Sequence, residues 1–209
     1  MATRAGWQPA DTDTRRGDQV LPVNGPAHPR SIVVDIPGLV VLVGAAGVGK
    51  STFAAAVFEP ADVLSSDALR EAVAGDPADQ RATRLAFSIL HRDVRRRLTA
   101  GRLVVVDATN VERHARLALV RVARAAAVPS VAILLRADGA TIHTRNALRP
   151  GRVVPPDIVD RHLAALRRLG DDPDAMAGTL RLEGFAAAPV VDALAPAVTI
   201  ERRRSRPVE

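Results

Sequence analysis

The sequence predicts an α/β fold with a mostly parallel central sheet covered by helices on both faces. Continuous aliphatic runs at residues 39–43, 103–106 and 131–135 are typical of strands buried on both faces. Segments with helical periodicity lie between these runs, and strands that alternate with helices favour parallel pairing. A length of 209 residues with 47% hydrophobic residues fits one folded domain.

The order of elements follows from the same patterns. Gly101 is expected to close a helix over residues 80–100 at its C′ position, and Asp157 is expected to cap a helix over residues 157–169. Strands are predicted over residues 39–43, 62–65, 103–107 and 131–135, with a last strand over 198–200. Helices are predicted over residues 51–58, 67–74, 80–100, 112–127, 140–148 and 157–169.

Composition divides the chain into three segments and excludes several kinds of chemistry. We expect a disordered extension over 1–30, a folded domain over 31–201 and a basic tail over 202–209. The chain has no cysteine, which excludes disulfides, thiol catalysis and Cys-ligated metals. No apolar run is long enough to span a bilayer and the N-terminus has no apolar signal core, so no membrane contact and a cytoplasmic location are expected.

A phosphate-binding loop follows the first buried strand. The segment Gly44-Ala45-Ala46-Gly47-Val48-Gly49-Lys50-Ser51 matches G-x-x-x-x-G-K-[ST] and directly precedes a helix, as the motif requires. Its glycines let successive N–H groups point into one cavity at the positive end of that helix. Lys50 is the only lysine beside 28 arginines. In this motif it reaches the β- and γ-phosphates of ATP, while the Ser51 hydroxyl ligates Mg²⁺.

Within the proteins that carry this loop, a small kinase is the favoured class. With only one lysine the chain has no N-K-x-D motif, which argues against a guanine-nucleotide switch. Ala108 follows Asp107, so the chain lacks the glutamate with which motor and remodelling ATPases activate water. A kinase instead uses a hydroxyl of its substrate as the nucleophile. The sequence therefore predicts a P-loop kinase fold.

The acceptor side of such a kinase needs a carboxylate that faces the γ-phosphate. Asp67 follows the second predicted strand, at the sheet edge where α/β proteins bind their ligands. Arg70, three residues later, falls on the same helix face. The alternative is that Asp67 only caps the helix and Arg70 is a surface residue.

Several stretches resemble the kinase module of bacterial polynucleotide kinase-phosphatases, which are RNA end-healing enzymes. The similarity extends over about residues 32–206 and is most specific at the D-x-x-R pair and at two arginines of an expected helical lid. The stretches are Gly44 to Thr52, Ser65 to Asp67 with Arg70, Asp79-Gln80, Ala86-Phe87, Leu90-His91, Val105 to Asn110, Arg145-Asn146, Arg149, Arg161-His162 and Leu182 to Phe185.

The resemblance implies roles for particular residues. Asp67 would be the general base for a 5′-hydroxyl of single-stranded RNA or DNA, and Arg70 would hold the neighbouring phosphate of that strand. Arg145 and Arg149 would clamp the ATP phosphates together with the loop up to Thr52. Lys50, Asp67 and Arg145 would be the catalytic set, and Asp107 an outer-sphere partner of Mg²⁺. Separate phosphatase and ligase partners fit this reading.

Two other functions stay open at this point. A kinase of a small metabolite or antibiotic would keep the same core and the same base. A non-catalytic module would bind ATP without phosphoryl transfer. The preference for RNA or DNA, the nucleotide donor and the oligomeric state are not predicted. The five histidines have no metal-ligand spacing, and His91 and His162 are expected to pack or to face solvent.

Overall fold

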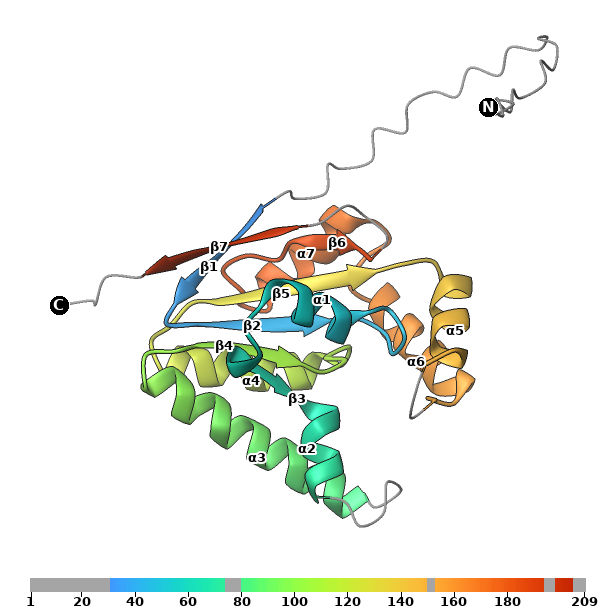
Figure 1. Ribbon diagram of the computed structural model, residues 1–209. Coiled ribbons are helices and arrows are strands. Elements are labelled where there is room, and N and C mark those ends of the chain that lie inside the picture. Colours follow the sequence, from blue (N-terminus) through green and yellow to red (C-terminus); the bar gives the residue numbers. More distant parts are fainter. Residues whose placement is uncertain (1–30, 74–79, 150–152, 194–197, 205–209) are drawn as a thin grey trace, which may run out of the picture.

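A five-stranded parallel sheet forms the centre of the protein (Figure 1). The computed structural model describes residues 31–73, 80–149, 153–193 and 198–204. The strand order is β3-β4-β2-β5-β6, and each neighbouring pair is parallel. The strands are β2 (Gly38–Val43), β3 (Val63–Ser65), β4 (Leu103–Asp107), β5 (Ser130–Arg136) and β6 (Val190–Asp192). The predicted α/β class is confirmed.

The three central strands form the core. Every residue of β2 and β4 is buried, and in β5 only Arg136 is partly exposed. Aliphatic side chains on both faces of a strand remove apolar area from water on both sides, which explains why these runs do not alternate with polar residues. Ser65 pairs in register with Asp107, so the ends of β3 and β4 meet at one edge of the sheet.

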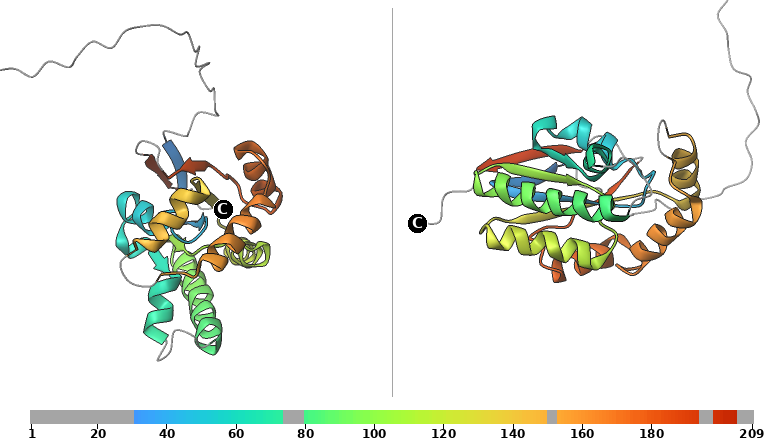
Figure 2. Two further views of the ribbon diagram at one scale, coloured as in Figure 1. Left: turned by 90° about the vertical axis from the view of Figure 1, so that its right-hand side faces the viewer. Right: turned by 90° about the horizontal axis from the view of Figure 1, so that it is seen from below.

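Helices cover both faces of the sheet. The helix α1 follows β2 and lies on one face, whereas α3 and α4 lie on the other (Figure 2). Connections between parallel strands are right-handed crossovers, so the direction in which a connection crosses the sheet decides which face its helix covers. The connection from β2 to β3 crosses the sheet in the opposite direction to those from β3 to β4 and from β4 to β5, and its helix therefore lies on the opposite face. The helices are α1 (Lys50–Val57), α2 (Ser66–Val73), α3 (Gln80–Thr99), α4 (Arg113–Ala125), α5 (Gly139–Ala147), α6 (Pro156–Arg167) and α7 (Pro173–Leu182), with a 3₁₀ turn η1 (Pro60–Asp62).

A second, two-stranded sheet joins segments far apart in the sequence. It pairs β1 (Ser31–Ile36) in parallel with β7 (Thr199–Arg204). The strand expected over 198–200 thus extends to Arg204, and residues 202–204 belong to β7 rather than to a tail. Arg203 donates to both carboxylate oxygens of Asp35, at 2.7 and 3.1 Å. The predicted extension 1–30 and residues 205–209 lie outside the described residues.

Helix boundaries near the end of the domain differ from the expected ones. The helix α7 was not expected, although Asp172 and Pro173 form an ordinary helix start in which the Asp172 carboxylate accepts from the backbone N–H groups of Asp174 and Ala175. Asp157 does not cap α6, because Pro155 holds that position and Asp157 instead pairs with Arg161 at 2.7 Å. Within the described ranges, no helix is both long and apolar enough to cross a bilayer.

Candidate active site at the phosphate-binding loop

The phosphate-binding loop connects β2 to α1 and is held from two sides. On one side the Gly44 N–H donates to the Thr109 carbonyl, at 3.0 Å, in the segment after β4. On the other side Gly47 adopts a φ of 85° against α5. A Cβ at Gly47 would lie only 2.7 Å from the Ile142 carbonyl oxygen, so this close approach requires glycine. The expected strand–loop–helix context is present.

Lys50 lies inside this loop with its ammonium in a backbone cradle. Its Nζ donates to the carbonyl oxygens of Gly44, at 3.0 Å, and Ala45, at 2.8 Å. Burial lowers the Lys50 pKa to about 8, while the negative charges of Asp107 and Asp67 partly oppose the shift. The ammonium is therefore charged at neutral pH. Two carboxylates attract it, Asp107 at the end of β4 and Asp67 at the start of α2.

An oxygen-donor pair at the same edge suits Mg²⁺. Ser51 is exposed in the first turn of α1, and Asp107 is buried at the end of β4. Hydroxyl and carboxylate oxygens are donors that Mg²⁺ uses together with water and nucleotide phosphates. Thr52 follows Ser51 and is also exposed. Among the described residues, no group of three or more His, Asp or Glu side chains is placed to hold a metal.

Asp67 lies between two arginines from different elements. Arg70, one turn later in α2, forms a close ion pair with Asp67 Oδ1 and also donates from Nε to the Ser66 carbonyl at 3.2 Å. Arg149, just after α5, donates from Nη2 to Asp67 Oδ2 at 3.3 Å. More than half of the Asp67 side chain is exposed, at 55%. The alternative that Asp67 merely caps the helix is not what the geometry favours, because Asp67 is inside α2 and its carboxylate contacts arginines.

Arg145 reaches the loop from α5. Its Nη1 lies 3.4 Å from the Val48 carbonyl oxygen and is the nearest side-chain atom to the position that a Cβ at Gly49 would occupy. The next residue, Asn146, is buried and exchanges two hydrogen bonds with the backbone of Val154, at 2.7 and 3.2 Å. These bonds tie the end of α5, which carries Arg145, to the segment before α6.

His162 of α6 contacts the loop directly, which sequence reasoning did not foresee. The Ala46 N–H donates to His162 Nδ1 at 3.4 Å. Burial and then the charge of Lys50 lower the His162 pKa from its ordinary value. The ring is thus neutral near pH 7, and Nδ1 can accept a hydrogen bond. Only membership in the Arg161-His162 stretch distinguished this histidine in the sequence.

A buried ion pair supports the segment that holds Gly44. Arg116 of α4 makes two 2.7 Å hydrogen bonds to the carboxylate of Glu183 and two more to the carbonyls of Asn110 and Val111. Asn110 has a φ of 47°, and its side chain donates to the Leu42 carbonyl at 2.8 Å. A chain of contacts therefore runs from the end of α7 to the last residues of β2. The sequence did not indicate that Arg116 is buried, because it is one of several arginines in an amphipathic helix.

Removal of one partner from the buried ion pair should be strongly destabilising. We predict that Arg116→Ala lowers the free energy of unfolding by about 3–5 kcal/mol, because it leaves the Glu183 carboxylate buried without its partner. Arg113 also lies within 3.8 Å of Glu183 but is largely exposed, so Arg113→Ala should cost less than about 1 kcal/mol. Urea denaturation of the two variants measures the difference; equal losses would contradict the assigned role.

The single lysine makes the electrostatics of the loop directly measurable. In protein labelled with ¹³C-lysine, the one side-chain Cε resonance should titrate with a midpoint near pH 8 rather than 10.5. Asp107→Asn removes an attraction that raises the Lys50 pKa, so its midpoint should be lower still. Since ATP phosphates favour the charged ammonium, ATP affinity should weaken about tenfold between pH 7 and 9. A midpoint above pH 10 would show that the ammonium is solvated.

Comparisons with known proteins assign the family. A family model described as an AAA domain matches residues 39–171. No curated protein matches the chain. A gluconokinase from Sinorhizobium meliloti 1021 shares the fold with a TM-score of 0.51 and 22% identity, over 78% of this chain and 86% of that one. Kti12 from Chaetomium thermophilum, in complex with ADP-AlF3, matches with a TM-score of 0.52 and 18% identity, over 74% and 88%.

A chain of the Pnkp1/Rnl/Hen1 RNA repair complex is also similar. Its TM-score is 0.58 at 23% identity, over 64% of this chain and 45% of that chain. Identities below 25% establish the common fold, and the family match covers well over half of the sequence. With its phosphate-binding loop between β2 and α1 of a parallel sheet, the chain belongs to the AAA domain family, and it shares its α/β fold with these proteins.

Proposed function

We propose that the protein is an ATP-dependent polynucleotide 5′-hydroxyl kinase. The observation that carries this proposal is the position of Asp67, a carboxylate held between Arg70 and Arg149. Its negative charge also partly opposes the lowering of the Lys50 pKa by burial. A base and the cations for a transferring phosphoryl group thus converge at one edge of the sheet.

The donor phosphates would lie in the loop. Backbone N–H groups of the loop, apart from those of Gly44 and Ala46 that donate to Thr109 and His162, and the start of α1 would attract phosphate oxygens. Lys50 and Arg145 would add positive charge. Phosphoryl transfer spreads negative charge over three oxygens, so fixed cations stabilise the transition state more than the ground state. Ser51 would hold Mg²⁺ directly and Asp107 would hold it through water. The bound ion would neutralise negative charge on the β- and γ-phosphates.

The acceptor hydroxyl would meet Asp67. As the bond from the 5′-oxygen to the γ-phosphorus forms, the hydroxyl proton passes to the Asp67 carboxylate, and the bond to the bridging oxygen breaks to release ADP. Arg149 would exchange the carboxylate for a γ-phosphate oxygen, which leaves Oδ2 free to accept that proton. Arg70 would keep its contact with Asp67 and bind the phosphate next to the acceptor hydroxyl.

The position of Arg70 favours an acceptor that itself carries phosphate. A neutral sugar needs no cation beside the general base, whereas an internucleotide phosphate next to a 5′-hydroxyl does. The D-x-x-R pair and the lid arginines support the same acceptor through their resemblance to polynucleotide kinase modules. The fold shared with a chain of an RNA repair complex is compatible with it. In that setting, separate phosphatase and ligase enzymes would complete the repair of the strand.

A small-molecule kinase is the second candidate. It is favoured by the gluconokinase likeness, which covers 86% of that enzyme's chain. Asp67 would still be the base, and Arg70 would bind an acidic group of the metabolite.

The choice between acceptors can be tested by transfer of label from [γ-³²P]ATP. We expect label on 5′-OH RNA or DNA oligonucleotides and none on gluconate or on 5′-phosphorylated oligonucleotides. Lys50→Ala controls for contaminating kinases. Label on the sugar acid alone would move the assignment to a metabolite kinase, and ATP binding without transfer to any hydroxyl would indicate a non-catalytic module.

Variants of the arginine–aspartate pair test the assigned roles. Asp67→Asn should lower kcat by a factor of about 10²–10⁴ with little change in ATP affinity, because it removes the base but keeps the shape. Arg70→Ala should chiefly raise KM for the strand. The matched control is Asp157→Asn in the exposed Asp157–Arg161 pair, which should change neither constant. A near-normal kcat for Asp67→Asn would remove Asp67 from the mechanism.

A further inference from the structure

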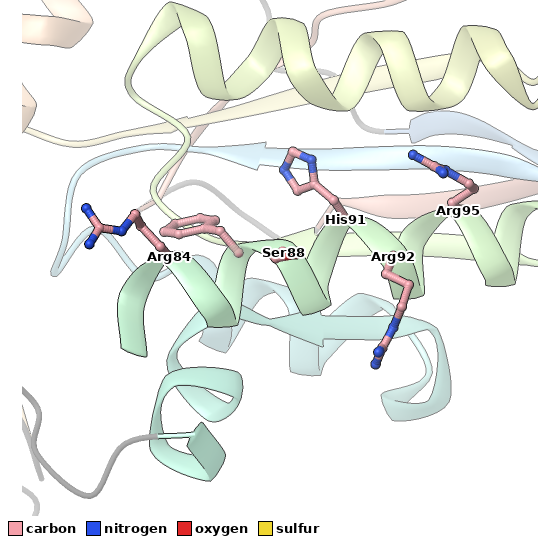
Figure 3. A pocket seen from close by; sticks show the side chains of 6 residues that line it. Arg84, Ser88, His91, Arg92 and Arg95 are labelled. Carbon is pink, nitrogen blue, oxygen red and sulfur yellow. The ribbon is translucent and has the colours of Figure 1, made fainter. Parts of the chain in front are cut away.

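A hollow runs along one side of α3, outside the site described above. Its lining residues are spaced by three, four, seven, eight and eleven positions from the first, which places them on one helix face. They are Arg84, Phe87, Ser88, His91, Arg92 and Arg95. Figure 3 shows the side chains of His91 and Arg95 on the side of α3 toward α4, whereas the side chain of Arg92, at the margin of this face, extends away from α4. We call Arg84, Phe87, His91 and Arg95 the α3 groove.

The arginines of the α3 groove differ from the other arginines of the same helix. Arg92 and Arg96 lie 3.6 and 4.0 Å from the Asp93 carboxylate, and Arg97 donates to the Ala61 carbonyl at 2.6 Å. Within the described part of the chain, Arg84 and Arg95 have no acidic partner at salt-bridge distance. Burial, and after it the charge of Arg95, lowers the pKa of His91, so this charge also acts within the groove. Uncompensated positive charge of this kind attracts a polyanion.

An exposed aromatic ring lies among these cations. The other three phenylalanines are internal: Phe58 and Phe185 are buried, and Phe53 packs against Phe58. Phe87 remains 37% exposed, in a chain whose aromatic content is only 2%. An apolar ring beside these arginines suits single-stranded nucleic acid, whose bases stack while its phosphates pair with cations. An acidic peptide would use the arginines but has no general need for the ring.

The α3 groove lies on the helix against which the helix of the proposed acceptor site packs. The helix α2, which carries Asp67 and Arg70, packs along α3 (Figure 1). Arg84 is in the first half of α3, and Arg95 follows eleven residues later, about 16 Å along the axis. The cations therefore follow a line that a few nucleotides of an extended strand can span.

We propose that the α3 groove binds the single-stranded polynucleotide downstream of its 5′-terminal nucleotide. This inference rests on the proposed function and adds to it a second contact region. Arg84 and Arg95 bind backbone phosphates, and Phe87 contacts a base. Since these contacts are to phosphates and to a ring, the groove increases affinity for longer strands without selecting a sequence.

The test compares strand lengths and measures binding separately from catalysis. A fluorescent 5′-OH 12-mer is titrated with the full-length protein by anisotropy, and KM is measured for the 12-mer and for a trinucleotide. We expect Arg84→Ala/Arg95→Ala to weaken 12-mer binding about tenfold or more and to lower the salt slope by about 1.4. The trinucleotide KM and kcat should not change. Phe87→Leu should weaken binding with an unchanged salt slope.

The matched control removes two exposed arginines elsewhere. Arg167→Ala/Arg181→Ala makes the same change of net charge in α6 and α7, and 12-mer binding should stay within twofold of the unmodified protein. Equal losses in both double variants, undiminished 12-mer binding in the groove variant, or equal competition by poly-glutamate would overturn the proposal. If Arg84→Ala/Arg95→Ala loses 12-mer binding while the unmodified protein phosphorylates no acceptor, the binding role of the α3 groove is supported and the proposed kinase activity is contradicted.

Discussion

The structure depends on holding a strongly curved glycine loop around a single buried ammonium. Lys50 has lost most of its water, and backbone carbonyls of Gly44 and Ala45 take the place of that water. Such a cradle keeps its shape only if the loop cannot open. It is held by the Thr109 carbonyl on the sheet side and by α5 on the side of Gly47. The curvature needed for phosphate binding is thus imposed by neighbours on both sides.

The neighbours of the loop are themselves secured by contacts far apart in the sequence. Arg116 and Glu183 fix the segment after β4, and Asn146 ties the end of α5 to Val154 before α6. Asp67 connects these regions electrostatically, because it binds an arginine of its own helix and one from the lid. Movement of the lid would therefore change the surroundings of the proposed base and of the phosphates together.

Local patterns predicted the central sheet and the loop well. The strands β2, β4 and β5 bury both faces, so their continuous aliphatic runs distinguish them, and the expected limits are within one residue of the observed ones. The phosphate-binding loop is a contiguous motif, so its place between strand and helix was predictable. By contrast, β1 owes its position to pairing with β7, where Ser31 lies opposite Thr199. The local sequence cannot indicate a pairing partner 168 residues away, and the charged sequence of β7 resembled that of a solvent-exposed tail.

The same distinction applies to the site. The place of Asp67 at the sheet edge and its pairing with Arg70 follow from local spacing. The contacts of Asp67 with Arg149, of Ala46 with His162 and of Arg116 with Glu183 join separate elements, and each depends on how those elements pack. In a chain with 28 arginines, sequence alone could not separate Arg116, which is buried, from solvated arginines on similar helix faces.

The central claim is that Asp67 and Lys50 face each other across the transferring phosphate. A crystal structure with Mg²⁺, a non-hydrolysable ATP analogue and a 5′-OH dinucleotide tests it most directly. We expect an Asp67 carboxylate oxygen within about 3.2 Å of the 5′-oxygen, with Arg149 moved to the γ-phosphate. A 5′-oxygen far from Asp67, with Arg149 still on the carboxylate and another group beside the hydroxyl, would contradict it.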